Sequence, residues 1–200
     1  MVNIEKKISF TIFIDNNINI VENLIVNKLN NIFDKEKVVI KIINKEEIKW
    51  NLIHVNESLL DYQSYIFKNK NNDIIYFDNT GESYHSLIWN ICTKNKIHTI
   101  YIRMSDDKYI YPGYKLCYYD HGDEKRIIHC YKDINKWIFF TKGEVQFFED
   151  DKLYEQKIKK KRFNREIIKQ YCKKLNIDIE DKEFWTPVGD VYNIVRNKVK

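Results

Sequence analysis

Residues 8–14 read Ile8-Ser9-Phe10-Thr11-Ile12-Phe13-Ile14, a run that alternates at first and then becomes continuously apolar. This pattern is typical of a strand that is buried on both faces. Asp15-Asn16-Asn17 ends the strand, and a helix is expected next, with Asn19 as its N-cap and Glu22 completing a capping box. Because a buried strand that leads directly into a helix indicates a crossover connection, this stretch decides the predicted fold.

The remainder of the first half repeats this order. The expected elements are strands at 38–43, 73–78 and 97–104, a helix from about Asn56 to Phe67, and a helix after the turn Asn79-Thr80-Gly81 that buries Tyr84, Leu87, Ile88 and Ile91. Strands that alternate with helices predict right-handed crossovers and a mainly parallel sheet over residues 1–104.

After Met104, hairpin signals replace the helices. Strands are expected at 114–120, 125–131, 136–141 and 144–148, with turns at 121–123 and 142–143, as in an antiparallel meander. A helix capped by Asn164 and ended at Asn176 follows, and a short final helix is expected near 191–195. The predicted fold class is therefore α/β to α+β, with a crossover lobe at 1–104 and a meander with C-terminal helices at 105–200, packed as one compact unit.

The composition indicates a globular chain with a substantial core, because 44% of its 200 residues are hydrophobic and 14% are aromatic. The N-terminus lacks the apolar stretch and cleavage site of a secretory signal, and no apolar run approaches the roughly 20 residues that cross a bilayer. We therefore expect a cytoplasmic protein without membrane contact. Its widely spaced cysteines are expected to be buried small hydrophobes: Cys92, Cys117, Cys130 and Cys172.

Two Asp-Asn pairs follow apolar strands, at Asp15-Asn16 and Asp78-Asn79. In a parallel sheet the two carboxylates would meet over one crevice and could hold a metal ion on a phosphate-containing substrate, with Glu82 in the same site. Helix capping and Asx-turns explain the same residues without any ligand. A metal-assisted enzyme thus remains one alternative.

Other catalytic or metal-binding patterns are weak. Cys117, His121, His129 and Cys130 share a predicted hairpin, but adjacent strand residues point to opposite faces, so we expect no zinc site there. The sequence contains no nucleophile elbow, phosphate loop, dinucleotide fingerprint or zinc-protease motif. No cofactor is expected, and the sequence favours a protein that is not an enzyme.

Positive charge is concentrated in one segment. Residues 151–174 carry a net charge of +7, whereas the rest of the chain sums to −2. Cations near a helix N-terminus oppose the helix dipole, so an anionic partner explains them better than local stability does. That partner is either an acidic protein surface or, as a second alternative, nucleic acid bound by Lys157–Arg165. The candidate partner-binding residues are Tyr154, Lys157, Lys159, Lys160, Lys161, Arg162, Phe163 and Arg165.

The C-terminal third contains an aromatic and basic pattern: Trp137-Ile138-Phe139-Phe140-Thr141-Lys142-Gly143, Phe148-Glu149, Tyr154, Lys161-Arg162-Phe163, Ile168, Tyr171, Leu175 and Phe184-Trp185. It resembles bacterial immunity proteins of polymorphic-toxin systems. The resemblance implies a non-enzymatic protein that neutralises a cognate toxin by direct binding. Inhibitors of nuclease toxins tend to be acidic, so the basic segment departs from that pattern and leaves the kind of toxin open.

Overall fold

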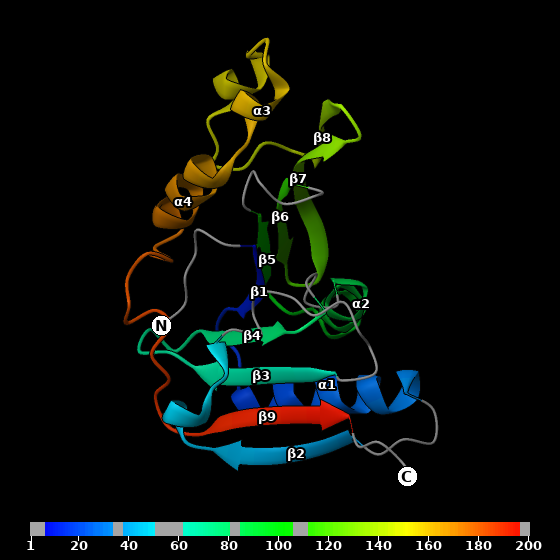
Figure 1. The fold of residues 1–200 in the computed structure, drawn as a ribbon, viewed down its shortest axis with the longest axis vertical. Coiled ribbons are helices and arrows are strands. Elements are labelled where there is room, and N and C mark those ends of the chain that lie inside the picture. The colour runs from blue at the N-terminus through cyan, green and yellow to red at the C-terminus, as the bar shows by residue number, and fades with distance from the viewer. Residues whose placement is uncertain (1–6, 34–37, 51–61, 81–84, 106–111, 197–200) are drawn as a thin grey trace.

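The computed structural model describes residues 7–33, 38–50, 62–80, 85–105 and 112–196. Within these residues, nine strands form one sheet in the order β2-β9-β3-β4-β1-β5-β6-β7-β8 (Figure 1). The strands are β1 (Ile8–Phe13), β2 (Val38–Ile43), β3 (Gln63–Lys68), β4 (Ile74–Asp78), β5 (Thr99–Met104), β6 (Gly113–Asp120), β7 (Asp123–Asp133), β8 (Lys136–Gly143) and β9 (Val191–Arg196). Every neighbouring pair is antiparallel.

The predicted parallel sheet is therefore wrong. Strand β1 lies between β4 and β5 and is antiparallel to both, and the helix after β1 leads to β2 at the far edge of the sheet. All six residues of β1 are buried because both faces of the sheet are covered, which gives an antiparallel strand the continuous apolar pattern of a parallel one. The continuous apolar run of β1 therefore reflects its burial on both faces and does not indicate the direction of its neighbours.

Two other predicted elements change type. Residues 63–68 form β3 instead of the second half of a helix, and residues 56–61 lie outside the described residues. Residues 191–196 form β9, which pairs with both β2 and β3, instead of a final helix. The β-branched residues Val191, Ile194 and Val195 suit that position, because branched side chains pack well on a pleated surface.

The C-terminal meander of β6, β7 and β8 is confirmed, but its predicted fourth strand is not. Lys142 and Gly143 belong to the end of β8 instead of a turn, and Gly143 has a positive φ of 85°. A Cβ there would lie 2.0 Å from the Lys125 carbonyl oxygen, so only glycine fits this close approach. Residues 144–148 leave the sheet and cross onto one of its faces.

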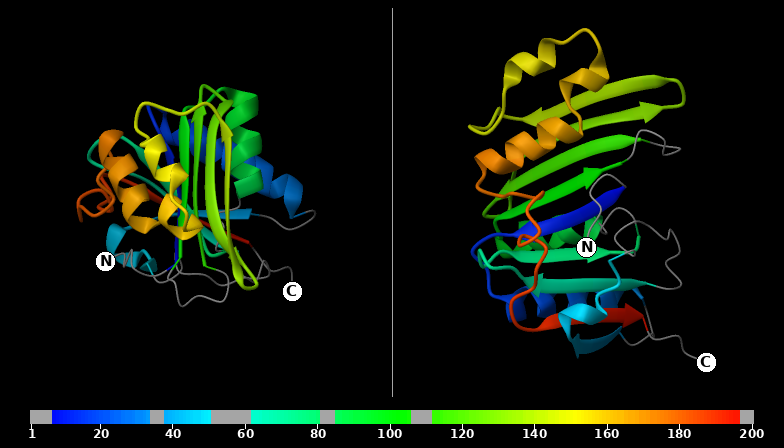
Figure 2. Two further views of the ribbon diagram at one scale, coloured as in Figure 1. Left: turned by 90° about the horizontal axis from the view of Figure 1, so that it is seen from above. Right: turned by 60° about the vertical axis from the view of Figure 1, so that its left-hand side comes forward.

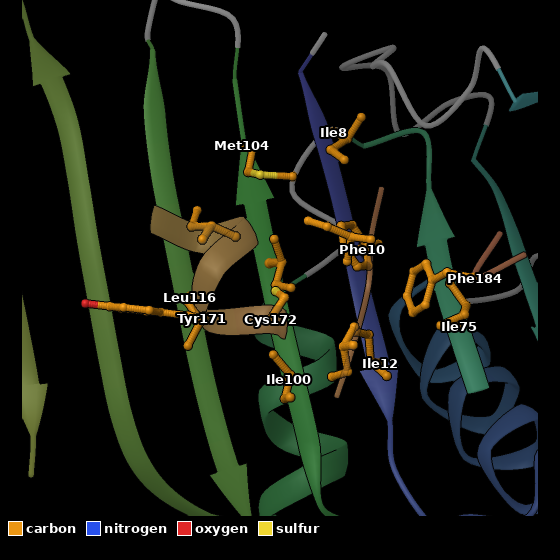
Figure 3. Close-up of a cluster of buried hydrophobic side chains, with 14 of the residues drawn as sticks. Ile8, Phe10, Ile12, Ile75, Ile100, Met104, Leu116, Tyr171, Cys172 and Phe184 are labelled. Carbon is orange, nitrogen blue, oxygen red and sulfur yellow. The ribbon is translucent and has the colours of Figure 1, made fainter. Parts of the chain in front are cut away.

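Helices cover both faces of the sheet. Helices α1 (Ile18–Ile32) and α2 (His85–Asn95) lie on one face, while the short α3 (Lys159–Arg162) and α4 (Arg165–Lys174) lie on the other (Figure 2). The α4 face carries the larger apolar cluster, in which Tyr171, Cys172 and Phe184 pack over Phe10 and Leu116 (Figure 3). None of the helices in the described ranges is long and apolar enough to cross a bilayer.

Helix ends follow the sequence signals in part. The Asn164 side chain accepts hydrogen bonds from the Glu166 and Ile167 amides, and Asn176 adopts a left-handed φ of 61°, as predicted. The N-cap of α1 is Asn17 instead of Asn19, and Glu22 is buried instead of closing a capping box. All four cysteines are free and buried, which confirms their expected role as small hydrophobes.

Candidate protein-binding surface

Helix α3 consists only of cations, Lys159-Lys160-Lys161-Arg162, and lies on one face of β8. Lys160 Nζ lies 5.4 Å from the centroid of the Trp137 ring, and Arg162 Cζ lies 5.7 Å from that of Phe139. Both distances are within the reach of a cation–π interaction. We call β8, α3 and the 3₁₀ helix η4 (Asp151–Glu155) the α3–β8 surface.

Strand β8 forms an edge of the described sheet, pairing with β7 on one side. The Lys132 amide of β7 donates to the Pro112 carbonyl on the β6 side (2.9 Å). Because backbone groups alternate between the two sides of a strand, Trp137, which lies opposite Lys132, turns its N–H and C=O away from β7. Phe139 and Thr141 repeat this orientation, so the outer edge of β8 offers backbone groups to another strand.

Large apolar side chains are exposed around the same edge. Ile134 in the β7–β8 turn is 82% exposed and Phe147 after β8 is 74% exposed, and Phe140, Val145 and Ile158 are also exposed. The β7–β8 turn, Trp137 and Lys159 line a hollow of about 360 Å³. Apolar side chains gathered in this way, rimmed by cations, are typical of a protein-binding surface.

A buried ion pair holds the segment after β8 against the sheet. Arg126 Nε and Nη2 donate to Glu149 Oε2 at 3.1 and 2.8 Å, and Arg126 Nη1 donates to the Gly143 carbonyl at 2.6 Å. The Tyr154 hydroxyl also donates to Glu149 Oε2, while Glu149 Oε1 accepts from the Gln146 amide at 2.8 Å. The side chains of Arg126 and Glu149 are 4% and 0% exposed. This network fixes the position of η4 and its approach to α3.

The predicted partner-binding residues fall into two groups. Lys157, Lys159 and Lys161 are exposed, and Lys160 and Arg162 are half-buried on the rings of β8. Phe163 and Arg165 are buried, which corrects the prediction for them, whereas Tyr154 is half-buried within η4 and its role in binding stays a prediction. Phe163 is fully buried in the core, Arg165 is buried and donates to the Ser105 carbonyl at 2.9 Å, and Tyr154 is tied to Glu149.

The alternative site at Asp15 and Asp78 does not form. Strands β1 and β4 are antiparallel, with Phe13 opposite Ile74 and Thr11 opposite Tyr76, so their carboxyl ends lie at opposite ends of the pair. Asp15 follows β1 beyond Phe13, about six residues or roughly 20 Å along the pair from Asp78. The third predicted member, Glu82, lies outside the described residues.

The Asp78 carboxylate instead accepts hydrogen bonds from neighbouring residues of the chain. Its Oδ2 accepts from the Tyr76 hydroxyl and its Oδ1 from the Thr80 hydroxyl, both at 2.6 Å, and Oδ1 also accepts from the Thr80 amide at 2.9 Å. Burial raises the pKa of Asp78 to about 6, although these hydrogen bonds oppose the rise. Asp78 therefore closes the end of β4 as a buried Asx-turn.

The residues of the weak zinc pattern lie on different faces of the sheet. Cys117 belongs to the apolar cluster under α1 and α2, whereas Cys130 belongs to the cluster under α4. Burial raises the pKa of both thiols to about 12, so neither is a reactive thiolate at neutral pH. Within the residues that the structure describes, no group of three or more His, Cys, Asp or Glu side chains could hold a metal ion.

Sequence reasoning missed Arg126 and Glu149 as well as the exposed rings of Phe140 and Phe147. The ion pair joins residues 23 positions apart and depends on the fold of the meander. The sequence predicts that successive side chains of β8 point to opposite faces of the sheet. It does not indicate which of these two faces a helix covers. The comparisons add no relative, since no family model, no curated protein and no solved structure matches this chain.

Proposed function

We propose that this protein is a non-enzymatic binding protein that recognises an acidic protein partner through the α3–β8 surface. The observation that carries the proposal is the all-cationic helix α3 beside an open, aromatic edge strand. An extended acidic segment could add to β8 through backbone hydrogen bonds while the lysines of α3 neutralise its carboxylates. Exposed apolar residues at both ends of β8 would then supply buried contact area.

The resemblance to immunity proteins supports a toxin as that partner. Most of the residues that carry it belong to the core under α4, including the fully buried Phe148 and Phe163. Those buried residues therefore indicate that this chain and the immunity proteins pack their cores in a similar way. Trp137, Phe139 and the cations of α3 belong to the α3–β8 surface instead. Neutralisation of a toxin by direct binding requires no chemistry from this chain.

Affinity capture of proteins from the native host tests the proposal, with the parent protein and surface variants of it as bait. The parent protein should retain one acidic protein in stoichiometric amount, identified by mass spectrometry. Lys161→Glu together with Phe147→Ser should weaken retention at least about tenfold, because a like-charge contact and a lost apolar anchor each cost 1 kcal/mol or more. Both residues are exposed, so the variant should keep the stability of the parent.

Lys94→Glu is the matched control, since Lys94 is an exposed helical lysine at the end of α2. It should retain the partner as the parent does. Equal retention by all three proteins would refute binding through the α3–β8 surface. Retention of nucleic acid in place of a protein, with an affinity that falls steeply with salt, would replace this proposal by the nucleic-acid alternative.

A further inference from the structure

A hollow of about 370 Å³ lies beside the 3₁₀ helix η1 (Lys45–Glu47), which directly follows the edge strand β2. Figure 1 shows η1, drawn in cyan, next to the segment that leads into β9. The apolar part of the lining is Trp50, Trp185 and Pro187, and the charged part is Lys45, Glu46 and Lys182. We call this site the tryptophan hollow.

The two indole rings form walls at a right angle. Their centroids are 6.4 Å apart, and the planes of the rings meet at 86°. Trp185 is held in place because its Nε1 donates to the Ile179 carbonyl at 2.9 Å, and Trp50 is stacked on Phe77 with centroids 5.5 Å apart. Both rings are therefore fixed by contacts within the protein before any ligand binds, which lowers the entropic cost of binding.

The charges at the rim of the tryptophan hollow are not used by the fold. Lys45 and Lys182 are exposed, and neither forms an ion pair with another residue that the structure describes. The neighbouring Asp181 is different, since it pairs with Lys70. Two lysines against the single acid Glu46 give the described lining a net charge of +1. A ligand with one negative charge complements this lining best.

The size of the tryptophan hollow suits a single small ring system. Sites for small molecules span about 300–1,000 Å³, and this hollow lies at the lower end of that range. A planar ring that stacks on one indole would direct its edge toward the other, and both arrangements are favourable for aromatic pairs. The long, flexible side chains of the two rim lysines could then reach an anionic group on that ring.

We propose that the tryptophan hollow binds a planar aromatic compound that carries one anionic group, of the class of the aromatic carboxylates. Trp50 and Trp185 contact the ring, and Lys45 and Lys182 neutralise the carboxylate. The same lysines disfavour a cationic compound with the same ring. This site is independent of the α3–β8 surface, because the two share no residue and lie toward opposite edges of the sheet.

Calorimetric titration of the whole chain with indole-3-acetate, tryptophol, tryptamine and acetate tests the proposal. Indole-3-acetate should bind with a Kd of about 1 mM or lower, as expected for a ligand of this size in a small site. Tryptophol has the ring without the charge and should bind at least about threefold more weakly, and the cationic tryptamine more weakly still. Acetate has the charge without the ring and should show no measurable binding.

Variants separate the ring contacts from the charges. Lys45→Met should weaken indole-3-acetate about threefold and leave tryptophol unchanged. Thr186→Glu adds a negative charge at an exposed lining position and should weaken indole-3-acetate at least about tenfold. Trp50→Leu should weaken both ligands. Lys94→Met and Trp89→Leu are matched controls at exposed positions of α2, on the other face of the sheet, and should bind like the parent.

Three results would overturn the proposal. The first is the absence of indole-3-acetate binding by the parent protein. The second is equal affinity for indole-3-acetate and tryptamine, which would show that the negative charge is not recognised. The third is equal weakening by Trp50→Leu and Trp89→Leu, which would show that the ligand binds elsewhere. Thermal unfolding shows whether each variant is folded, and Thr186→Glu tests the tryptophan hollow even if Trp50→Leu does not fold.

Discussion

At the scale of single residues, Asp78 is a buried acid whose hydrogen bonds are all internal. Because burial raises its pKa from 3.8 to about 6, the folded state retains a proton that the unfolded state releases between these values. The stabilisation that protonated Asp78 provides is complete below pH 3.8 and is lost as the pH rises through 6. For a difference of about two pH units, the loss is about 3 kcal/mol.

Asp78→Asn removes this titration and keeps the size of the side chain. Relative to the parent, the variant should gain about 3 kcal/mol of unfolding free energy between pH 3 and pH 8, because only the parent must bury a charge at the higher pH. Urea denaturation at a series of pH values measures the difference. A difference that stays constant with pH would contradict this role of Asp78.

Glu149 and Arg126 form the buried ion pair that fixes the position of η4 and its approach to α3 in the α3–β8 surface. Glu149→Gln leaves the Arg126 cation without its counter-charge in a buried site, and we expect a loss of about 3–5 kcal/mol. Glu124→Gln, which breaks the more exposed pair with Lys142, should cost about 1 kcal/mol or less. Similar losses in chemical denaturation for the two variants would contradict the structural role of the buried pair.

At the scale of elements, helix α4 begins at the Asn164 cap. Asn164→Ala removes two hydrogen bonds to the first turn and should cost about 1 kcal/mol, whereas Asn164→Asp should keep the stability of the parent because Asp is an equally good cap. Thermal unfolding of the two variants compares them. Equal losses for Ala and Asp would show that the side-chain oxygen does not cap the helix.

Most elements could be predicted from the sequence, and their pairing could not. Caps such as Asn164 and the strand at 38–43 are local, so nearby residues specify them. Strand direction depends on which segments meet, and the buried β1 has the same pattern in either arrangement. In the same way the cations of α3 were visible in the sequence, but their contact with Trp137 and Phe139 required the position of α3 on β8.

At the scale of the whole molecule, β9 near the C-terminus pairs with β2 and β3 from the N-terminal half of the chain. Ile194 is fully buried, lies opposite Ile40 of β2 and Ser64 of β3, and packs in the cluster under α1. Ile194→Ala should therefore cost about 2–5 kcal/mol, while Ile42→Ala on the edge strand, where the side chain is 63% exposed, should cost about 0.5 kcal/mol or less.

Chemical denaturation of the two alanine variants compares these positions. A small loss for Ile194→Ala would mean that β9 is not an integral strand of the sheet. The expected large loss would show that residues from both ends of the chain contribute to one folding unit. Such a unit holds the edge strand β8 and its helix in place at the far side of the sheet.

Amide hydrogen exchange of the protein with and without its captured partner locates the binding surface directly. If an acidic protein binds the α3–β8 surface, exchange should slow at the outward-facing amides of Trp137, Phe139 and Thr141 and in α3, and should stay unchanged in β2 at the opposite edge. Slowed exchange confined to β2 and β9, with β8 and α3 unaffected, would contradict the proposed function.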